Sequence, residues 1–320
     1  MLDQLLPVSV CIPVRNEESH IAACLDSLRG CFDDIVVVDS GSTDSTCRIA
    51  TDRNARVVSF QWDGRFPKKR NWALRTVPFR HDWILFLDAD ERLTEAFLAE
   101  LERTLRGCPH AGFWLSYTNH FMGRELKHGD RLRKLALFRR AAGEYEAFPE
   151  NLWTGLDMEI HEHPVLNGSV GRIAAPIDHR DDRGLHHYIA KHNEYSSWEA
   201  NRFAWLASQG PDASAKLGRR QAFKYRNLDK WWLGHLYFWA CVLLKRGFLD
   251  GIAGWRFAAL KRRYFNDIRL KILEARERTR PAASAPKQNA SSRSSLGQPF
   301  PRHTTRGLAA AKHHGRVDGS

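Results

Sequence analysis

The sequence has only six cysteines in 320 residues, and none of them forms a Cys-x-x-Cys pair or another spacing typical of a zinc site. This excludes a small disulfide-held module and favours buried thiols in a reducing compartment. The first ten residues lack a basic segment followed by a long apolar run, so a secretory signal is not expected. The longest uncharged run of interest, 231–244, is too short for a membrane-spanning helix. These absences predict a cytoplasmic protein that at most lies on a membrane surface.

Two further absences narrow the function. No Gly-x-Gly-x-x-Gly follows the first apolar run, which argues against an NAD-dependent oxidoreductase. The common nucleic-acid motifs are also missing, so no nucleic-acid partner is expected.

The chain carries 12 more basic than acidic residues, and they are unevenly distributed. Residues 216–320 hold 23 basic and 6 acidic residues, whereas residues 1–215 hold 26 basic and 31 acidic residues. An acidic partner is therefore expected to meet the last third of the chain.

The first 105 residues alternate between short apolar runs and segments with helical spacing. The runs are typical of strands buried on both faces, and they cover residues 8–12, 35–38, 57–60 and 83–87. Thr94 is predicted to cap the helix that follows the fourth run. This alternation favours an α/β fold with a mostly parallel central sheet, in the layout that binds nucleotides.

The rest of the chain changes character twice. Residues 106–185 contain shorter extended pieces between loops, as expected for a mixed extension of the sheet. Residues 186–279 have helical spacing, interrupted at Gly210-Pro211. Residues 280–320 are rich in Ser, Ala, Pro and Gly and are predicted to be disordered. The predicted organisation is thus an α/β domain over 1–185, a helical region over 186–279 and a disordered tail.

Polar residues follow three of the predicted strands, at the edge where doubly wound sheets bind ligands. They occupy residues 15–18, 39–44 and 88–91. Each group could instead cap a helix, because Asn, Ser and Asp are common capping residues. That alternative is weaker for Asp88 and Asp90, since two carboxylates after a buried strand repel each other unless a cation lies between them. Asp-x-Asp at this position predicts a Mg²⁺ or Mn²⁺ site for a nucleotide diphosphate.

Four blocks in a fixed order carry a family resemblance. They read IPVRNEE (12–18), VDSGSTDST (38–46), RNWAL (70–74) and LDADE (87–91). In this order they resemble glycosyltransferase family 2, whose members are inverting enzymes with the GT-A fold. Looser similarity to the bacterial lipopolysaccharide-core β-glucosyltransferase branch lies in FPKKR (66–70), IHEHPVLNG (160–168) and GFLDG (247–251). One departure is Ser40, where many family members have a second Asp.

The resemblance implies a GT-A catalytic domain over residues 1–185, with a nucleotide-binding half (1–105) and an acceptor half (106–185). It also implies roles for single positions. Pro13, Arg15 and Glu17 would contact the nucleotide, and Asp39 would accept a hydrogen bond from the uracil ring. Arg70 would lie near the base or the diphosphate. Asp88 would lie near the ribose, and Asp90 would bind the metal.

Arg70 also has an independent rationale, because its planar guanidinium matches phosphate oxygens. The alternative for Arg70 and its neighbours Lys68 and Lys69 is a solvated start of a helix.

Inverting transfer requires a base that removes the acceptor hydroxyl proton as C1 is attacked. Glu162 is predicted to be this base, because it lies outside the nucleotide half. Asp157 and Glu159 are rivals, and an ordinary loop ion pair is the alternative. His179 is predicted to complete the metal shell, although a His in a polar loop is often structural.

The helical region combines basic clusters with aromatic residues, as in Lys230-Trp231-Trp232 and Lys245-Arg246. Such a composition suits the headgroup boundary of an anionic membrane. The alternatives are helices that pack their aromatics on the catalytic domain, or a nucleic-acid groove. Together with this composition, the family resemblance implies metal-assisted transfer of a sugar, expected to be glucose, from a UDP-sugar to a lipopolysaccharide-core or other lipid-linked acceptor at the inner face of the cell membrane. A non-catalytic membrane or nucleic-acid binding protein on the same fold is the alternative function.

Overall fold

Four parallel strands form the first half of a nine-stranded sheet. They are β1 (Val8–Val14), β2 (Asp34–Asp39), β3 (Arg56–Ser59) and β4 (Trp83–Phe86), in the order β3-β2-β1-β4. Every residue of β1 and β4 is buried, as the continuous apolar runs predict. The computed structural model describes residues 4–147, 157, 163–210 and 217–279. The four strands lie where the sequence predicts them, with ends shifted by one or two residues.

The second half of the sheet is mixed. The sheet continues from β4 through β8 (Arg133–Arg139), β6 (Gly112–Phe121) and β11 (Val170–His179) to β5 (Glu91–Arg92), and β7 (Arg124–Leu126) pairs with β6. Strand β8 runs antiparallel to both β4 and β6, whereas β6 and β11 are parallel. A separate pair is formed by β9 (Gly143–Tyr145) and β10 (Pro164–Leu166).

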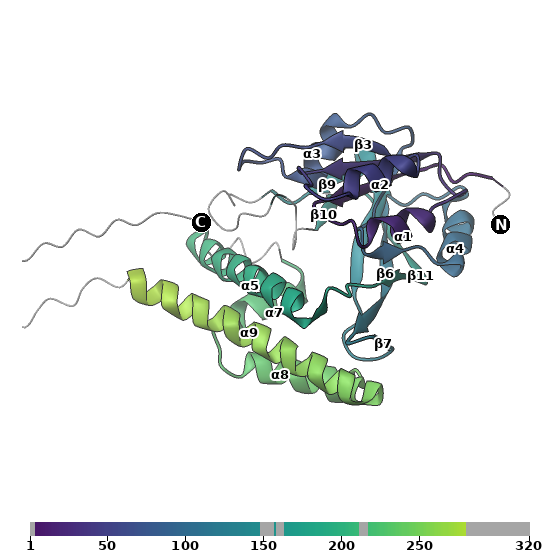
Figure 1. Cartoon of the computed structure of the whole chain (residues 1–320). Coiled ribbons are helices and arrows are strands. Elements are labelled where there is room, and N and C mark those ends of the chain that lie inside the picture. Colours follow the sequence, from purple (N-terminus) through teal and green to yellow (C-terminus); the bar gives the residue numbers. More distant parts are fainter. Residues whose placement is uncertain (1–3, 148–156, 158–162, 211–216, 280–320) are drawn as a thin grey trace, which may run out of the picture. The chain divides into compact units, whose positions relative to one another are not determined.

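Short helices connect the strands of the first half (Figure 1). They are α1 (Ile21–Asp26), α2 (Thr46–Asp52) and α3 (Lys69–Thr76), and α4 (Glu95–Leu105) leads from β5 to β6 in the second half. The predicted cap of α4 is present, because the Thr94 hydroxyl accepts a hydrogen bond from the Phe97 backbone N–H. One hydrophobic core runs through this part of the chain, from Leu6 to Ile177. The predicted α/β GT-A class, with a helical region after it, agrees with this arrangement.

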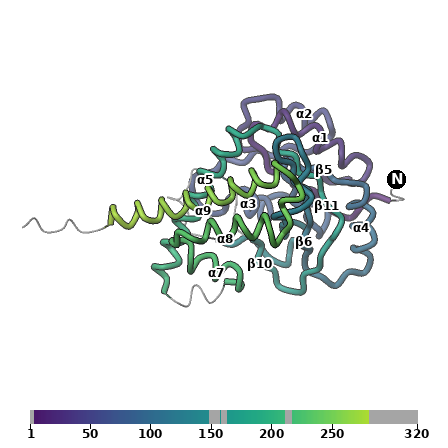
Figure 2. Tube along the Cα trace, turned by 90° about the horizontal axis from the view of Figure 1, so that it is seen from below, coloured from purple at the N-terminus to yellow at the C-terminus, as the bar shows by residue number. Residues whose placement is uncertain are grey.

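The helical region follows β11. It contains α5 (Gly184–Ser208), α7 (Arg219–Asn227), α8 (Leu233–Trp239), the π-helical turn η2 (Ala240–Leu244), the 3-10 turn η3 (Gly247–Asp250) and the long α9 (Gly251–Thr279). Helices α5 and α8 both lie alongside α9 (Figures 1 and 2). A second core, between Ala200 and Ile272, packs these helices together. None of the helices described is long and apolar enough to cross a membrane. The predicted disorder of 280–320 lies outside the described residues.

Asp250 joins the helical region to the sheet. Its carboxylate accepts hydrogen bonds from the backbone N–H of Lys127 (3.1 Å) and of His128 (2.9 Å), and from the His128 ring (3.0 Å). These residues belong to the loop between β7 and β8. The GFLDG block thus contains a residue that fixes this loop.

Candidate active site

Two loops after β1 and β2 are cross-linked at the ligand-binding edge of the sheet. Asn16 donates its backbone N–H to the Ser42 hydroxyl (2.8 Å) and accepts the Thr43 backbone N–H on its side chain (2.8 Å). Glu18 accepts the Ser45 backbone N–H (3.0 Å) in the same way. These hydrogen bonds therefore connect the two loops.

The predicted nucleotide contacts lie around these loops. Pro13 is buried near the end of β1, and Arg15 is exposed directly after it. Asp39, at the end of β2, accepts hydrogen bonds from the backbone N–H of Gly41 (2.9 Å) and Ser42 (3.1 Å). Gly41 has φ +78°, a conformation that favours glycine. Asp39 thus closes a tight turn, while a carboxylate with several lone pairs keeps further acceptor capacity.

Asp88 is balanced by two cations from distant elements. Arg70 in α3 donates to one of its oxygens (2.8 Å), and Lys134 in β8 donates to the other (2.5 Å). Burial alone would raise the pKa of Asp88, but Lys134 and Arg70 together hold it well below its usual range. Lys134 also donates to the wholly buried Glu91 (2.5 Å), whose pKa is raised by burial despite this cation. Asp88 is therefore ionised across the physiological pH range.

Asp90 is 6% exposed and lies among residues that follow β11. Its Oδ2 is 3.2 Å from an Arg183 guanidinium nitrogen and 3.7 Å from His179 Nε2. The antiparallel pairing of β11 with β5 places His179 opposite Glu91, which explains its approach to Asp90. Burial raises the pKa of Asp90, but the interaction with His179 more than offsets it, so the pKa is lowered. The Asp90 carboxylate is therefore also available as an anion.

The cations beside Asp88 and Asp90 weaken one reason for predicting a metal. The repulsion between Asp88 and Asp90 does not by itself require a metal, because Arg70, Lys134 and Arg183 already supply positive charge. Arg183 also pairs with Glu17 (2.8 Å), so it bridges the loop after β1 to Asp90. Burial is the main cause of the raised pKa of Glu17.

Asp90 and His179 fit a divalent cation as a two-ligand set. Within the described residues, no group of three His, Cys, Asp or Glu side chains is arranged to hold a metal. Mg²⁺ on a nucleotide diphosphate needs only one or two protein ligands, because phosphate oxygens and water complete its shell. One oxygen of Glu17 is also buried without a hydrogen bond, although the His20 ring lies 3.3 Å from it. The chemistry of these residues is thus compatible with a metal held largely by its nucleotide.

The basic residues that open α3 are buried. Lys69 is 2% exposed, donates its Nζ hydrogen to the Val14 carbonyl (3.0 Å) and lies 3.2 Å from the Asp157 carboxylate. Burial is the main cause of the lowered pKa of Lys69. Lys68 is likewise buried, so the alternative of a solvated helix start is wrong. Asp157, a rival for the base, is held in this ion pair.

Glu162 and its other rival, Glu159, lie outside the described residues. Their neighbour His163 is described, and its ring lies 6.1 Å from that of Trp114. The identity of the base therefore stays a prediction.

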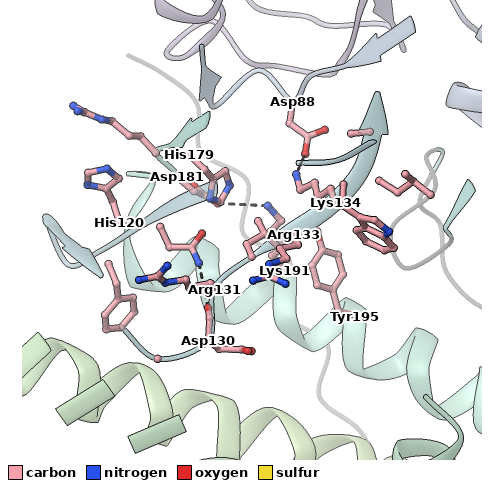
Figure 3. Close-up of a pocket in the computed structure, with 18 of the residues that line it drawn as sticks. Asp88, His120, Asp130, Arg131, Arg133, Lys134, His179, Asp181, Lys191 and Tyr195 are labelled. Atoms are coloured by element: carbon pink, nitrogen blue, oxygen red, sulfur yellow. Dashed lines mark hydrogen bonds and ion pairs between the residues drawn. The ribbon is translucent and has the colours of Figure 1, made fainter. Parts of the chain in front are cut away.

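A cavity of about 1830 Å³ begins at Asp88 and extends to the helical region (Figure 3). Arg70, Asp88, Lys134 and His179 line one part of it. Its other lining residues include many cations, namely Arg131, Arg133, Arg172, Arg180, Lys191, Arg220, Lys245 and Lys261. Figure 3 shows Lys134 directed at Asp88, and Lys191 lies 3.5 Å from Asp181. The cavity is large enough for a nucleotide sugar and part of an acceptor.

Comparison with known proteins identifies the family. The model of the glycosyl transferase family 2 matches residues 9–155. An uncharacterized glycosyltransferase of Rickettsia prowazekii is 35% identical over 223 residues, which cover 65% of this chain and 70% of the relative. The chain belongs to glycosyltransferase family 2. The lipopolysaccharide core biosynthesis glycosyltransferase LpsC of Rhizobium meliloti is 28% identical to this family 2 enzyme over 269 residues, which cover 80% of this chain and 90% of LpsC.

Solved structures similar to this glycosyltransferase include two bacterial enzymes. Glucosyl-3-phosphoglycerate synthase of Mycobacterium tuberculosis, in complex with Mn²⁺, UDP and glucosyl-3-phosphoglycerate, is 31% identical over 34% of this chain and 43% of its own, with a TM-score of 0.29. Staphylococcus aureus TarS 1–349, in complex with UDP-GlcNAc, is 18% identical over 85% of this chain and 92% of its own, with a TM-score of 0.40. As a family 2 member, the chain is an enzyme that acts on nucleotide sugars.

Several residues at the site of this glycosyltransferase cannot be identified from patterns in the sequence. Lys134 and Arg183 are basic residues that lie outside the four family blocks. Glu91 belongs to the LDADE block, but its burial beside Lys134 depends on β8, which is distant in sequence. Only the fold brings these residues together.

Proposed function

We propose that this enzyme transfers glucose, with inversion, from UDP-glucose to a lipopolysaccharide-core or other lipid-linked acceptor. The observation that supports it best is the pair Asp88 and Asp90 at the carboxyl edge of the parallel strands, with Asp88 lining the large cavity. Residues 1–185 would form the catalytic domain and residues 186–279 the basic aromatic region, in line with their separate hydrophobic cores. Pro13, Arg15, Glu17 and Asp39 would line the nucleotide, and Arg70 its diphosphate.

The reaction forms one bond as it breaks another. The acceptor oxygen attacks C1 of the sugar, the bond from C1 to the diphosphate breaks, and UDP leaves with the electron pair. Glu162 would take the proton of the acceptor hydroxyl. Asp90 and His179 would hold Mg²⁺ or Mn²⁺, which supplies positive charge to the departing diphosphate. Arg70 and Lys134 would keep Asp88 ionised to accept hydrogen bonds from the ribose.

The acceptor class is inferred from LpsC and from the charge of the helical region. LpsC is described as an enzyme of lipopolysaccharide core biosynthesis. Residues 217–279 carry 15 basic and 5 acidic residues, which complements an anionic membrane at the inner face of the cell envelope. An acceptor with a lipid would be presented to the cavity from such a surface.

Asp90→Ala tests the metal role. We expect this variant to lose UDP release from UDP-glucose in the presence of Mn²⁺ and acceptor, with a drop of roughly 10² or more. Asp52→Asn, which changes a largely exposed carboxylate of α2, is the matched control and should behave as wild type. A thermal-shift titration with UDP, with and without Mn²⁺, checks folding and binding in the same samples. Unchanged turnover by Asp90→Ala would remove the metal role.

Glu162→Gln tests the base. Binding of UDP should remain nearly normal, and transfer should fall by roughly 10² or more, because the amide cannot accept the proton. Glu159→Gln is the matched control from the same segment. If Glu162→Gln keeps wild-type transfer, another residue is the base.

A further inference from the structure

Large apolar side chains are exposed together where α8 turns into α9. We call this set the apolar corner, and it comprises Met122, Trp239, Leu243, Leu244, Phe248, Leu249, Ile252 and Trp255. Leu244 is 83% exposed and Ile252 is 68% exposed. A soluble protein rarely leaves this many neighbouring apolar side chains in water unless they contact a partner or a membrane.

Contacts between neighbouring elements join parts of the apolar corner. The rings of Trp239 and Trp255 lie 6.4 Å apart, which connects the end of α8 to α9. Met122, at the β6–β7 turn, is joined to α9 through Arg256, whose guanidinium lies 3.9 Å from its sulfur. The turn is also closely packed, because a Cβ on Gly254 would lie 1.9 Å from the Gly247 carbonyl oxygen. The exposed side chains are therefore held in place by a rigid backbone.

Basic residues surround the apolar corner. Arg124, Arg246 and Arg256 are all exposed beside it, and so is Lys245, which pairs with Asp130. Asp250, an acid of the same turn, is occupied by the loop of Lys127 and His128, and the exposed carboxylate of Glu125 lies on β7. An apolar surface with a rim of cations and exposed Trp side chains complements the headgroup boundary of an anionic bilayer.

A second copy of the chain fits this surface less well than a bilayer. A twofold interface uses the same patch on both subunits. It would therefore bring the basic rim of one copy against the basic rim of the other. Anionic lipid headgroups meet the same rim with opposite charge.

The apolar corner also borders the cavity. Met122 belongs to the corner and lines the cavity, and Lys245, which follows Leu244, lines the cavity as well. Phe257 and Lys261 of α9 continue this wall. A lipid held at the corner would therefore lie beside the cavity.

We propose that the apolar corner inserts into the headgroup boundary of an anionic bilayer and sets the cavity beside it. A lipid-linked acceptor then places its glycan in the cavity while its lipid stays in the membrane. This proposal rests on the membrane-borne acceptor proposed above, and it assigns the contact to the turn between α8 and α9. The basic residues along the helices then attract the anionic bilayer electrostatically but do not insert into it.

Vesicle flotation of the full chain tests the proposal. Leu244→Glu/Ile252→Glu should bind phosphatidylglycerol-containing vesicles about tenfold or more weakly than wild type, because it removes apolar contacts and adds negative charge. Leu270→Glu is the matched control, because Leu270 is a 50% exposed side chain of α9 outside the corner. It should bind as wild type. Equal vesicle binding by wild type and the double variant would overturn the proposal.

Two further measurements separate this proposal from its rivals. Sedimentation of the wild type without vesicles should give a monomer, and a dimer dissociated by Leu244→Glu/Ile252→Glu would instead make the corner a subunit interface. The thermal shift with UDP and Mn²⁺ should be the same in all three proteins. A wild type that binds vesicles through the corner but shows no shift with UDP would contradict the proposed sugar transfer and support the docking surface.

Discussion

The carboxyl edge of the sheet and the turn between α8 and α9 depart from the usual distribution of residues in opposite ways. At the sheet edge, charged side chains such as Lys69, Asp90 and Glu91 are buried. At the turn, apolar side chains such as Leu244 and Ile252 are exposed. Burying charge is costly unless it is paired, and exposing large apolar groups forgoes their burial. The buried charges and the exposed apolar side chains are therefore not explained by the stability of the fold alone.

The two regions also differ in what holds them. The sheet edge depends on ion pairs between elements far apart in sequence, such as Lys134 with Asp88 and Arg183 with Glu17. The apolar corner depends on a closely packed backbone turn and leaves its side chains without cover. Replacing a paired charged side chain at the sheet edge should therefore damage folding, whereas replacing an exposed apolar side chain at the corner should spare it.

The largest effect is expected for Lys134→Met. This change leaves Asp88 and the buried Glu91 without the cation they share, and it should lower the free energy of unfolding by about 3 kcal/mol or more. Urea unfolding at pH 7 measures it, with the exposed Lys127→Met as control. A loss below about 1 kcal/mol would show that the ion pairs at the sheet edge contribute no more than surface pairs.

His192 provides the next test, because it is a titratable group of the helical region whose ring packs against aromatic side chains. Its ring stacks on Tyr188 (3.9 Å) and meets the edge of Tyr264 (5.5 Å). Burial lowers its pKa to about 4, and the charges of Lys261 and Lys191 add to this. The unfolded chain therefore binds a proton below pH 6.5 that the folded chain takes up only near pH 4.

This difference in pKa makes the free energy of unfolding fall as the pH is lowered from 6.5 to 4. The loss in the free energy of unfolding that is due to His192 should reach about 2–3 kcal/mol and be complete below pH 4. Urea unfolding of wild type and His192→Gln at pH 7 and pH 4.5 isolates it, because other groups titrate equally in both. The same loss of stability in both proteins would contradict this role of His192.

A smaller effect is expected for Gly254→Ala. The new Cβ would lie 1.9 Å from the Gly247 carbonyl oxygen, so the turn must shift, at a cost of about 1–3 kcal/mol. Gly218→Ala is the control, because a Cβ there meets nothing within 4 Å. Thermal unfolding compares the two. Equal stability would mean that the turn is less rigid than its packing indicates.

The smallest effect is expected at the apolar corner itself. Leu244→Ser should change the free energy of unfolding by no more than about 0.5 kcal/mol, because its side chain is exposed. By contrast, Ile268→Ala in the helical core should cost about 2–5 kcal/mol. Urea unfolding of both variants measures the difference. A large loss for Leu244→Ser would assign the corner to the fold and not to a partner.

Local patterns in the sequence predict the sheet edge better than the helical region. Continuous apolar runs mark β1 and β4, and parallel strands bring their carboxyl ends together, so the neighbourhood of Asp39 and Asp88 follows from sequence. The partners of the acids do not follow, because Lys134 and Arg183 approach only through β8 and the end of β11. Pairing between distant elements leaves no periodic signal.

The aromatic residues of the helical region show a second limit. Trp231 and Trp239 are exposed, whereas Trp232 and Tyr237 pack on the helical core. Exposure to solvent and packing on the helical core thus apply to different members of one aromatic cluster, and membrane contact stays a prediction. Composition predicts the cluster, but the direction of each side chain depends on how α8 lies against α9.

The bond pattern of Asp250 has a practical consequence for dissecting the enzyme. A shortened chain that stops before Asp250 would lack the carboxylate that accepts the hydrogen bonds of the Lys127 and His128 backbone N–H groups. The loop between β7 and β8 would then be released. Since Lys134 lies in β8, loss of catalysis in such a fragment would report a distorted scaffold and not a missing lipid anchor. Genetic removal of the last third is therefore a poor assay for anchoring, and full-length point variants are the informative reagents.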